Sequence, residues 1–211
     1  MRSFVVLLTL FALALCASAW LYPGGTWFDR SSPGFSFWGN FWCDLLHQHA
    51  FNRSPNTSSM WLARVSFWLF GAALVRFWPL AATLSPRPKV QRWVSALGLS
   101  GAAALFFVTV FSSLSEPLLH GVFVVASALL GVFAASVLSL ALYRSVDPLT
   151  RVISLGLIAS ALLSVGQYMR QGMGGDAALW LAGAQKITTI FLLLFMLRCA
   201  LLYKRTQLAR A

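Results

Sequence analysis

Residues 118–143, LLHGVFVVASALLGVFAASVLSLALY, contain no Asp, Glu, Lys or Arg. A helix that crosses the hydrocarbon core of a bilayer needs roughly 20 consecutive apolar residues, so this run predicts a transmembrane span. Five further apolar runs predict five more spans, at about 4–21, 61–84, 93–114, 152–169 and 177–203. We therefore predict an all-α fold, a polytopic bundle of six transmembrane helices that forms one integral membrane domain over residues 1–211.

The composition of the chain agrees with a membrane location. Hydrophobic residues make up 59% of it and charged residues only 10%, whereas a soluble domain carries about 25% charged residues. The net charge of +11 comes from basic residues that lie singly or in short groups at the ends of apolar runs, as topology determinants do. We therefore expect membrane lipids as partners and no nucleic acid.

The first apolar run has two interpretations. A basic start, a short apolar stretch and the small residues at 17–19 are typical of a cleavable signal peptide. A retained span with an aromatic belt formed by Trp20 and Tyr22 explains the same residues, and we favour it. Both interpretations place the chain after Leu21 outside the cytoplasm.

Basic residues at the ends of the spans predict the orientation. Nine lie at one set of ends and four at the other, which predicts that both termini are cytoplasmic in a bacterial cell membrane. The nine are Arg2, Arg87, Lys89, Arg92, Arg144, Arg151, Lys204, Arg205 and Arg210, and the four are Arg30, Arg53, Arg64 and Arg170. All three histidines and four of the five acidic residues then fall on the outer side, so we expect any chemistry at that face.

The segment 22–60 is the only long loop, and its aromatic residues suit the headgroup layer. We predict a short interfacial helix over 38–51, on which Asp44 and His47 share a face. One hypothesis is a metal or hydrolytic site that combines Asp44, His47 and His49 with Glu116 and His120. The spacing matches no recognised metal motif, so the alternative is that Asp44 anchors the loop and the histidines are solvated. We predict no cofactor.

Two further features allow alternatives. Lys186 would lie roughly 13 Å down the sixth span if that span begins at residue 177, just after Asp176. An intramembrane cation at that depth indicates function, and an outer carboxylate, Glu116 or Asp44, is its expected partner. If the sixth span begins at Ile187 instead, Lys186 lies at the interface. The serines at 112, 113 and 115 lie near Glu116 and His120, as in a Ser–His–acid triad, but without a GxSxG elbow they are commoner as helix caps.

Small residues at four-residue spacing, such as Ser127, Gly131 and Ala135, predict closely packed helices. Ser164 belongs to a similar row on the fifth span. These rows favour a compact bundle and carry no functional indication of their own.

The stretch YPGG…FDRSSPGFSFWGNFWCDL, followed by a span and then by SEPLLHGVFVVAS, resembles uncharacterised six-helix bacterial membrane proteins. In those proteins an outer loop with Asn-x-x-x-Asp-Leu, here Asn40, Asp44 and Leu45, precedes the second helix, and a histidine, here His120, opens the fourth. The chain is also similar to DRAM/Sfk-type membrane proteins, although Cys43 replaces their serine. The resemblance implies one outer-face site and a link with lipid handling, and no established reaction.

We therefore expect a non-enzymatic membrane protein that binds lipid headgroups or a protein partner through its outer face, where His120 donates a hydrogen bond to Asp44. The competing hypotheses are a metal-dependent intramembrane hydrolase or transferase and a small-solute transporter with a buried, paired lysine. The candidate polar site consists of Asn40, Asp44, His47, Glu116, His120 and Lys186.

Overall fold

The computed structural model describes residues 2–111, 113–174 and 180–208. These residues form six long α-helices and one short 3-10 helix, η1. The helices are α1 (Arg2–Leu21), α2 (Thr57–Ala82), α3 (Pro88–Val110), α4 (Pro117–Leu142), α5 (Pro148–Gly172) and α6 (Leu181–Leu208), and η1 is Trp42–Leu46. All six are long and apolar enough to cross a membrane, which confirms the predicted all-α, multi-pass membrane fold.

Several helices begin earlier than the predicted spans. α3, α4 and α5 each start at a proline, Pro88, Pro117 and Pro148, because proline is preorganised for the first turn of a helix and lacks only an N–H that would have no partner there. Asp147 caps α5 by accepting the backbone N–H of Thr150 at 3.1 Å. An apolar run shows which residues can lie in lipid, whereas the prolines and the cap residue show where the helix starts. The helices therefore begin before the apolar runs do. Residues 177–179, at the start of the predicted sixth span, lie outside the described residues.

Two other boundaries also differ. α2 begins at Thr57, four residues before the predicted start, and α3 ends at Val110 rather than at 114. The next residue, Phe111, already has an extended backbone, with φ −88° and ψ 125°. The loop between α1 and α2 is therefore shorter than predicted, and the connection between α3 and α4 is longer.

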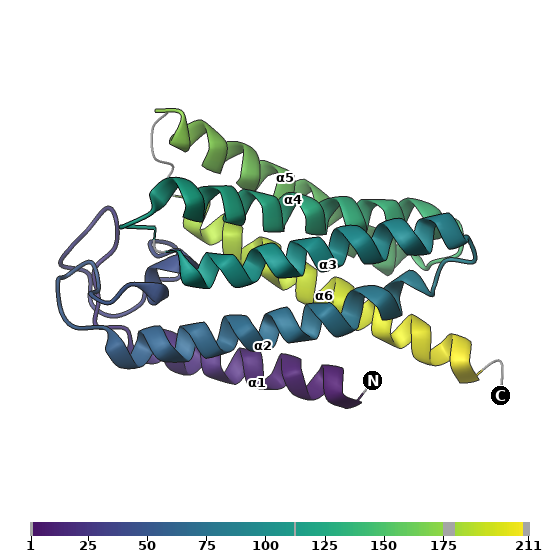
Figure 1. The fold of residues 1–211 in the computed structure, drawn as a ribbon, viewed down its shortest axis with the longest axis horizontal. Coiled ribbons are helices and arrows are strands. Elements are labelled where there is room, and N and C mark those ends of the chain that lie inside the picture. The colour runs from purple at the N-terminus through teal and green to yellow at the C-terminus, as the bar shows by residue number, and fades with distance from the viewer. Residues whose placement is uncertain (1, 112, 175–179, 209–211) are drawn as a thin grey trace.

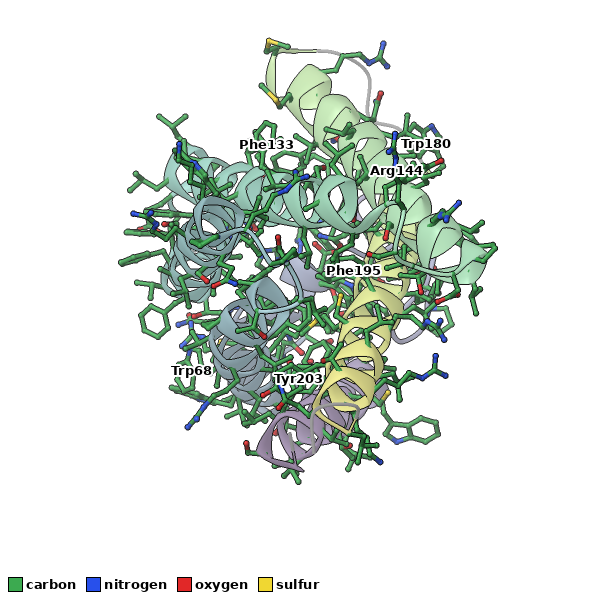
Figure 2. The ribbon with its side chains drawn as sticks, turned by 90° about the vertical axis from the view of Figure 1, so that its right-hand side faces the viewer. Trp68, Phe133, Arg144, Trp180, Phe195 and Tyr203 are labelled. Atoms are coloured by element: carbon green, nitrogen blue, oxygen red, sulfur yellow. The ribbon has the colours of Figure 1, made fainter. Side chains whose placement is uncertain are left out.

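Five of the helices close into a ring. α2, α3, α4, α5 and α6 pack in chain order, and α6 returns to contact α2. α1 packs on the outside of α2, where Phe11 stacks on Phe70 with ring centroids 4.5 Å apart. The ends of α1 and α6 marked N and C lie away from the long loop (Figure 1). In the view along the bundle, Phe195 lies in the interior and Trp68 on the periphery (Figure 2).

Large side chains pack together in the half of the ring away from the loop. Trp78 of α2 and Phe195 of α6 are both 2% exposed, and Phe77 lies between them in edge contact with the Phe195 ring. Trp78 fits only because α3 carries Gly98, where a Cβ atom would lie 2.1 Å from the indole. This close packing ends at the level of Trp78.

Candidate functional site

The loop between α1 and α2 folds over the end of the ring, but the predicted helix over 38–51 is wrong. Only Trp42–Leu46 is helical, as a single 3-10 segment. The Asp44 carboxylate accepts the backbone N–H of Phe41 at 2.8 Å, which fixes the start of the segment. At its end, the Asn56 side chain donates to the carbonyls of Leu45 and His47 at 3.2 and 2.9 Å, which would otherwise be available to continue the helix.

Asn40 is the centre of a buried polar network. It has no exposed surface, and its amide oxygen accepts the N–H of Ser36 at 2.9 Å. Its amide nitrogen donates to the Gly25 carbonyl at 2.9 Å and to the Asp44 carboxylate at 3.1 Å. The side chain of Asn40 therefore joins three parts of the loop, and Asp44 receives two of its hydrogen bonds within the same segment.

Lys186 attaches this network to α6. It lies within the helix, in its second turn, and is 1% exposed. Its ammonium donates to the backbone carbonyls of Asn40 and Ala182. The expected ion pair with Asp44 or Glu116 does not form; in the described part of the chain the ion pair within 4.0 Å joins Arg198 to Asp147. Main-chain carbonyls satisfy the buried cation instead.

Three aromatic rings complete the surroundings of the ammonium. Its nitrogen lies 5.0 to 5.5 Å from the ring centroids of Phe35, Phe37 and Trp42, within the range of cation–π attraction. We call Lys186 and these three rings the lysine box. The box places loop residues 35–42 on the first two turns of α6.

Burial dominates the electrostatics of Asp44. It raises the pKa of this carboxyl from 3.8 to about 6, against the hydrogen bonds from Asn40 and Phe41 and the charge of Lys186, all of which lower it. Asp44 therefore changes its charge close to pH 6, and not in the ordinary range of an aspartate.

Two of the histidines, His47 and His120, lie apart from this network and contact the connection between α3 and α4. His47 Nε2 lies 2.5 Å from the hydroxyl oxygen of Ser113, and its Nδ1 is buried without a hydrogen-bond partner. Burial lowers the pKa of His47 to about 4. His120 Nδ1 donates to the carbonyl of Phe111 at 2.8 Å, so the expectation that this histidine donates to Asp44 is wrong.

The remaining predicted residues lie apart. Glu116 is exposed at the start of α4 and accepts the hydroxyl of Ser115, and His49 is exposed in the loop. The Ser–His–acid triad, a less common arrangement than helix caps, does not form among the described residues, because Ser113 contacts His47; residue 112 lies outside them. Among the described residues, no three His, Cys, Asp or Glu side chains come together as a metal site requires. The structure thus joins Asn40, Asp44 and Lys186 and separates them from the other three.

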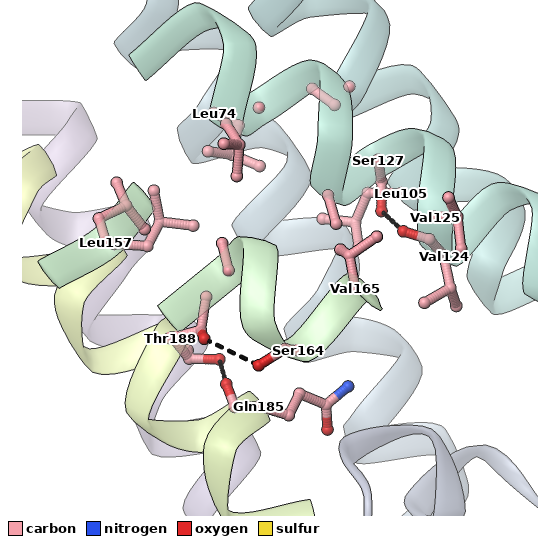
Figure 3. A pocket seen from close by; sticks show the side chains of 18 of the residues that line it. Leu74, Leu105, Val124, Val125, Ser127, Leu157, Ser164, Val165, Gln185 and Thr188 are labelled. Atoms are coloured by element: carbon pink, nitrogen blue, oxygen red, sulfur yellow. Dashed lines mark hydrogen bonds between the residues drawn. The ribbon is translucent and has the colours of Figure 1, made fainter. Parts of the chain in front are cut away.

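A cavity of about 200 Å³ lies inside the ring, beneath the loop (Figure 3). All five ring helices line it, together with Phe41 of the loop and, further from the loop, Trp78 of α2. None of the described residues that line it is charged. Along α6 its lining extends from Leu181 to Leu192, which corresponds to roughly 17 Å at the rise of an α-helix.

Polar groups gather on one wall of the cavity. Ser164 of α5 and Thr188 of α6 have their hydroxyl oxygens 3.3 Å apart, and Gln185 lies one turn nearer the loop (Figure 3). The oxygen of the Gln185 amide accepts the backbone N–H of Trp42 at 3.0 Å. This bond joins the cavity wall to the lysine box.

Sequence reasoning did not reveal this cavity. Its only signal was the rows of small residues, which we took to indicate helix packing. Gly101 and Gly131 do bring α3 and α4 together, since a Cβ at position 101 would lie 3.2 Å from the Gly131 nitrogen. Gly131, Ser127 and Ser164 also line the cavity, so the same small side chains leave the space empty.

Comparison of the chain with protein-family models, with curated proteins and with solved structures finds no match.

Proposed function

We propose that this integral membrane protein binds a membrane lipid, with one hydrocarbon chain of the lipid inside the five-helix ring. The observation that carries the proposal is the uncharged cavity between the loop and Trp78. Most of the lining is apolar and its polar groups lie mainly on one wall, so most of the space offers water no hydrogen-bond partner. Within a bilayer, the molecules available to fill such a space are lipids.

Energetics favour an occupied cavity. At about 24 cal/mol per Å³, a fully enclosed empty cavity of 200 Å³ would cost roughly 5 kcal/mol, which is the upper limit for this cavity, because it is partly open to its surroundings. Hydrocarbon that enters from the bilayer gains no hydrophobic free energy, since lipid tails are already apolar. It regains the dispersion contacts that the lining side chains otherwise lack.

The dimensions suit a lipid from one leaflet. The cavity extends roughly 17 Å along α6, and half of a hydrocarbon core of about 30 Å is about 15 Å. We place the loop on the outer side of a bacterial cell membrane, because the basic residues favour cytoplasmic termini. The lipid then comes from the outer leaflet. The resemblance to DRAM/Sfk-type proteins, which implies a link with lipid handling, is consistent with this proposal.

Two glycines allow a matched test. A Cβ atom on Gly131 or on Gly166 would meet no atom within 4 Å. Gly131 lines the cavity, whereas Gly166 is exposed on α5 and does not. Gly131→Leu therefore extends into the cavity, while Gly166→Leu makes the same chemical change toward the surrounding membrane.

The experiment is to purify the wild type and both variants in a mild detergent and to quantify co-purified lipid per protein by mass spectrometry. We expect the wild type and Gly166→Leu to retain about one lipid per chain through extensive washing, and Gly131→Leu to lose most of it. Thermal unfolding shows whether all three are folded. Equal lipid content in three folded proteins would contradict the proposal.

A further inference from the structure

The Gln185 amide has a fixed orientation. The backbone N–H of Trp42 can only donate, so the amide atom that it meets at 3.0 Å is the oxygen. This contact removes the usual ambiguity between amide oxygen and nitrogen. The NH₂ group then takes the other branch of the side chain, on the cavity wall (Figure 3), and no described residue accepts a hydrogen bond from it.

The neighbouring hydroxyls have already used their protons. Thr188 donates to the carbonyl of Ala184 at 3.0 Å, so the bond between Ser164 and Thr188 uses the proton of Ser164. Thr189 donates to the carbonyl of Gln185 at 2.9 Å. On this wall Gln185 thus offers two donor hydrogens where Ser164, Thr188 and Thr189 offer none, and an apolar chain would leave them without a partner at a cost.

The charged group nearby does not reach the cavity. Lys186 does not line it, because the lysine box and two carbonyls surround its ammonium. A buried carboxylate or phosphate would have no cationic partner and would pay a large desolvation penalty. The part of the ligand inside the cavity is therefore neutral.

We infer that the lipid carries a neutral carbonyl, an ester or an amide, next to its hydrocarbon chain, and that Gln185 donates to this oxygen. The inference rests on the proposed function and specifies the class of ligand. In an ester-linked lipid the carbonyl lies at the top of the chain, and Gln185 lies in the second turn of α6, near the loop. The same carbonyl occurs in a phospholipid, whose headgroup would remain outside, and in an uncharged diacylglycerol.

Ester and ether lipids with the same chains distinguish this hydrogen bond from packing alone. Delipidated protein is offered an equal mixture of dioleoyl phosphatidylcholine and its dioleyl ether analogue, and binding is measured by native mass spectrometry. A second mixture contains dioleoylglycerol and its diether analogue. We expect the wild type to prefer the ester about threefold to tenfold, as one net hydrogen bond provides. The pair that binds better identifies the source of the carbonyl.

Two variants test the role of Gln185. Gln185→Met has a similar volume but no amide, and we expect its ester-to-ether ratio to fall to about one while it still binds lipid. Thr189→Val is the control. It removes the acceptor of the Trp42 indole N–H, 3.3 Å away, and its own bond to the backbone carbonyl of Gln185, but it leaves the side-chain amide of Gln185 in place. We expect it to keep the ester preference.

The outcomes separate the two proposals. A wild-type ratio near one overturns the inference, whether or not Gln185→Met folds. The inference is also overturned if folded Gln185→Met keeps the ester preference. It is overturned as well if Thr189→Val loses the ester preference to the same extent as Gln185→Met. In each of these cases the proposed function still stands if Gly131→Leu loses its lipid, and it fails if Gly131→Leu binds both lipids as the wild type does.

Discussion

Burial shifts the pKa values of Asp44 and His47 in opposite directions. The pKa of Asp44 rises from 3.8 to about 6, so the folded protein holds this proton more tightly than the unfolded chain does. The stability that it contributes is complete below pH 4 and is lost as the pH rises through 6. At 1.36 kcal/mol per pH unit, the loss is about 3 kcal/mol.

His47 acts with the opposite sign. Its pKa falls from 6.5 to about 4, so below pH 6.5 the unfolded chain binds a proton that the folded protein does not. Its contribution is complete above pH 6.5 and is lost as the pH falls through 4, by about 3 kcal/mol. Between pH 4 and 6.5 the loss of stability from Asp44 and the gain from His47 largely cancel as the pH rises. A variant that removes one of the two groups should reveal the pH dependence contributed by the other.

The variants are Asp44→Asn, which keeps an acceptor for Asn40 and Phe41, and His47→Gln. Unfolding in detergent micelles is followed by tryptophan fluorescence from pH 4 to 7.5, and each variant is compared with the wild type at the same pH. Relative to the wild type, Asp44→Asn should gain about 3 kcal/mol as the pH rises, and His47→Gln should lose about as much. Parallel profiles for the three proteins would refute the reasoning from burial.

Two further predictions concern the loop. Lys186→Met removes the donor to the Asn40 carbonyl. Amide hydrogen exchange at residues 36–46 should then become at least tenfold faster, since a bond to a charged group contributes about 1.5–3 kcal/mol. Unchanged exchange there would contradict the assigned contact. Ser31→Cys places a thiol on the exposed loop, where an impermeant maleimide should label intact cells; labelling only after permeabilisation would reverse the orientation. The native Cys43 should react slowly, because burial raises its pKa to about 12.

The membrane fold could be predicted because each helix carries its own signal, an uninterrupted apolar run of sufficient length. Asp44 could be assigned to one face from the asymmetry of the acidic residues, Asn40 from the resemblance and Lys186 from its position in the sixth span. Their actual contacts could not, since Lys186 bonds a main-chain carbonyl 146 positions away and no side-chain pattern identifies that acceptor. The cavity also escaped prediction, because its volume depends on side-chain sizes on five helices at once.

Trp42 explains why a buried charge network lies above an uncharged cavity. Its ring covers the Lys186 ammonium, its indole N–H donates to Thr189, and its backbone N–H fixes the amide of Gln185. The network therefore sets the position of the adjacent Phe41, which lines the cavity. Buried ions seldom add net stability, and their best-attested use is to fix one arrangement among several. On this argument, Lys186 and Asp44 would act on the proposed lipid only indirectly, by holding the loop in one register on α6, while Gln185 would contact the lipid itself.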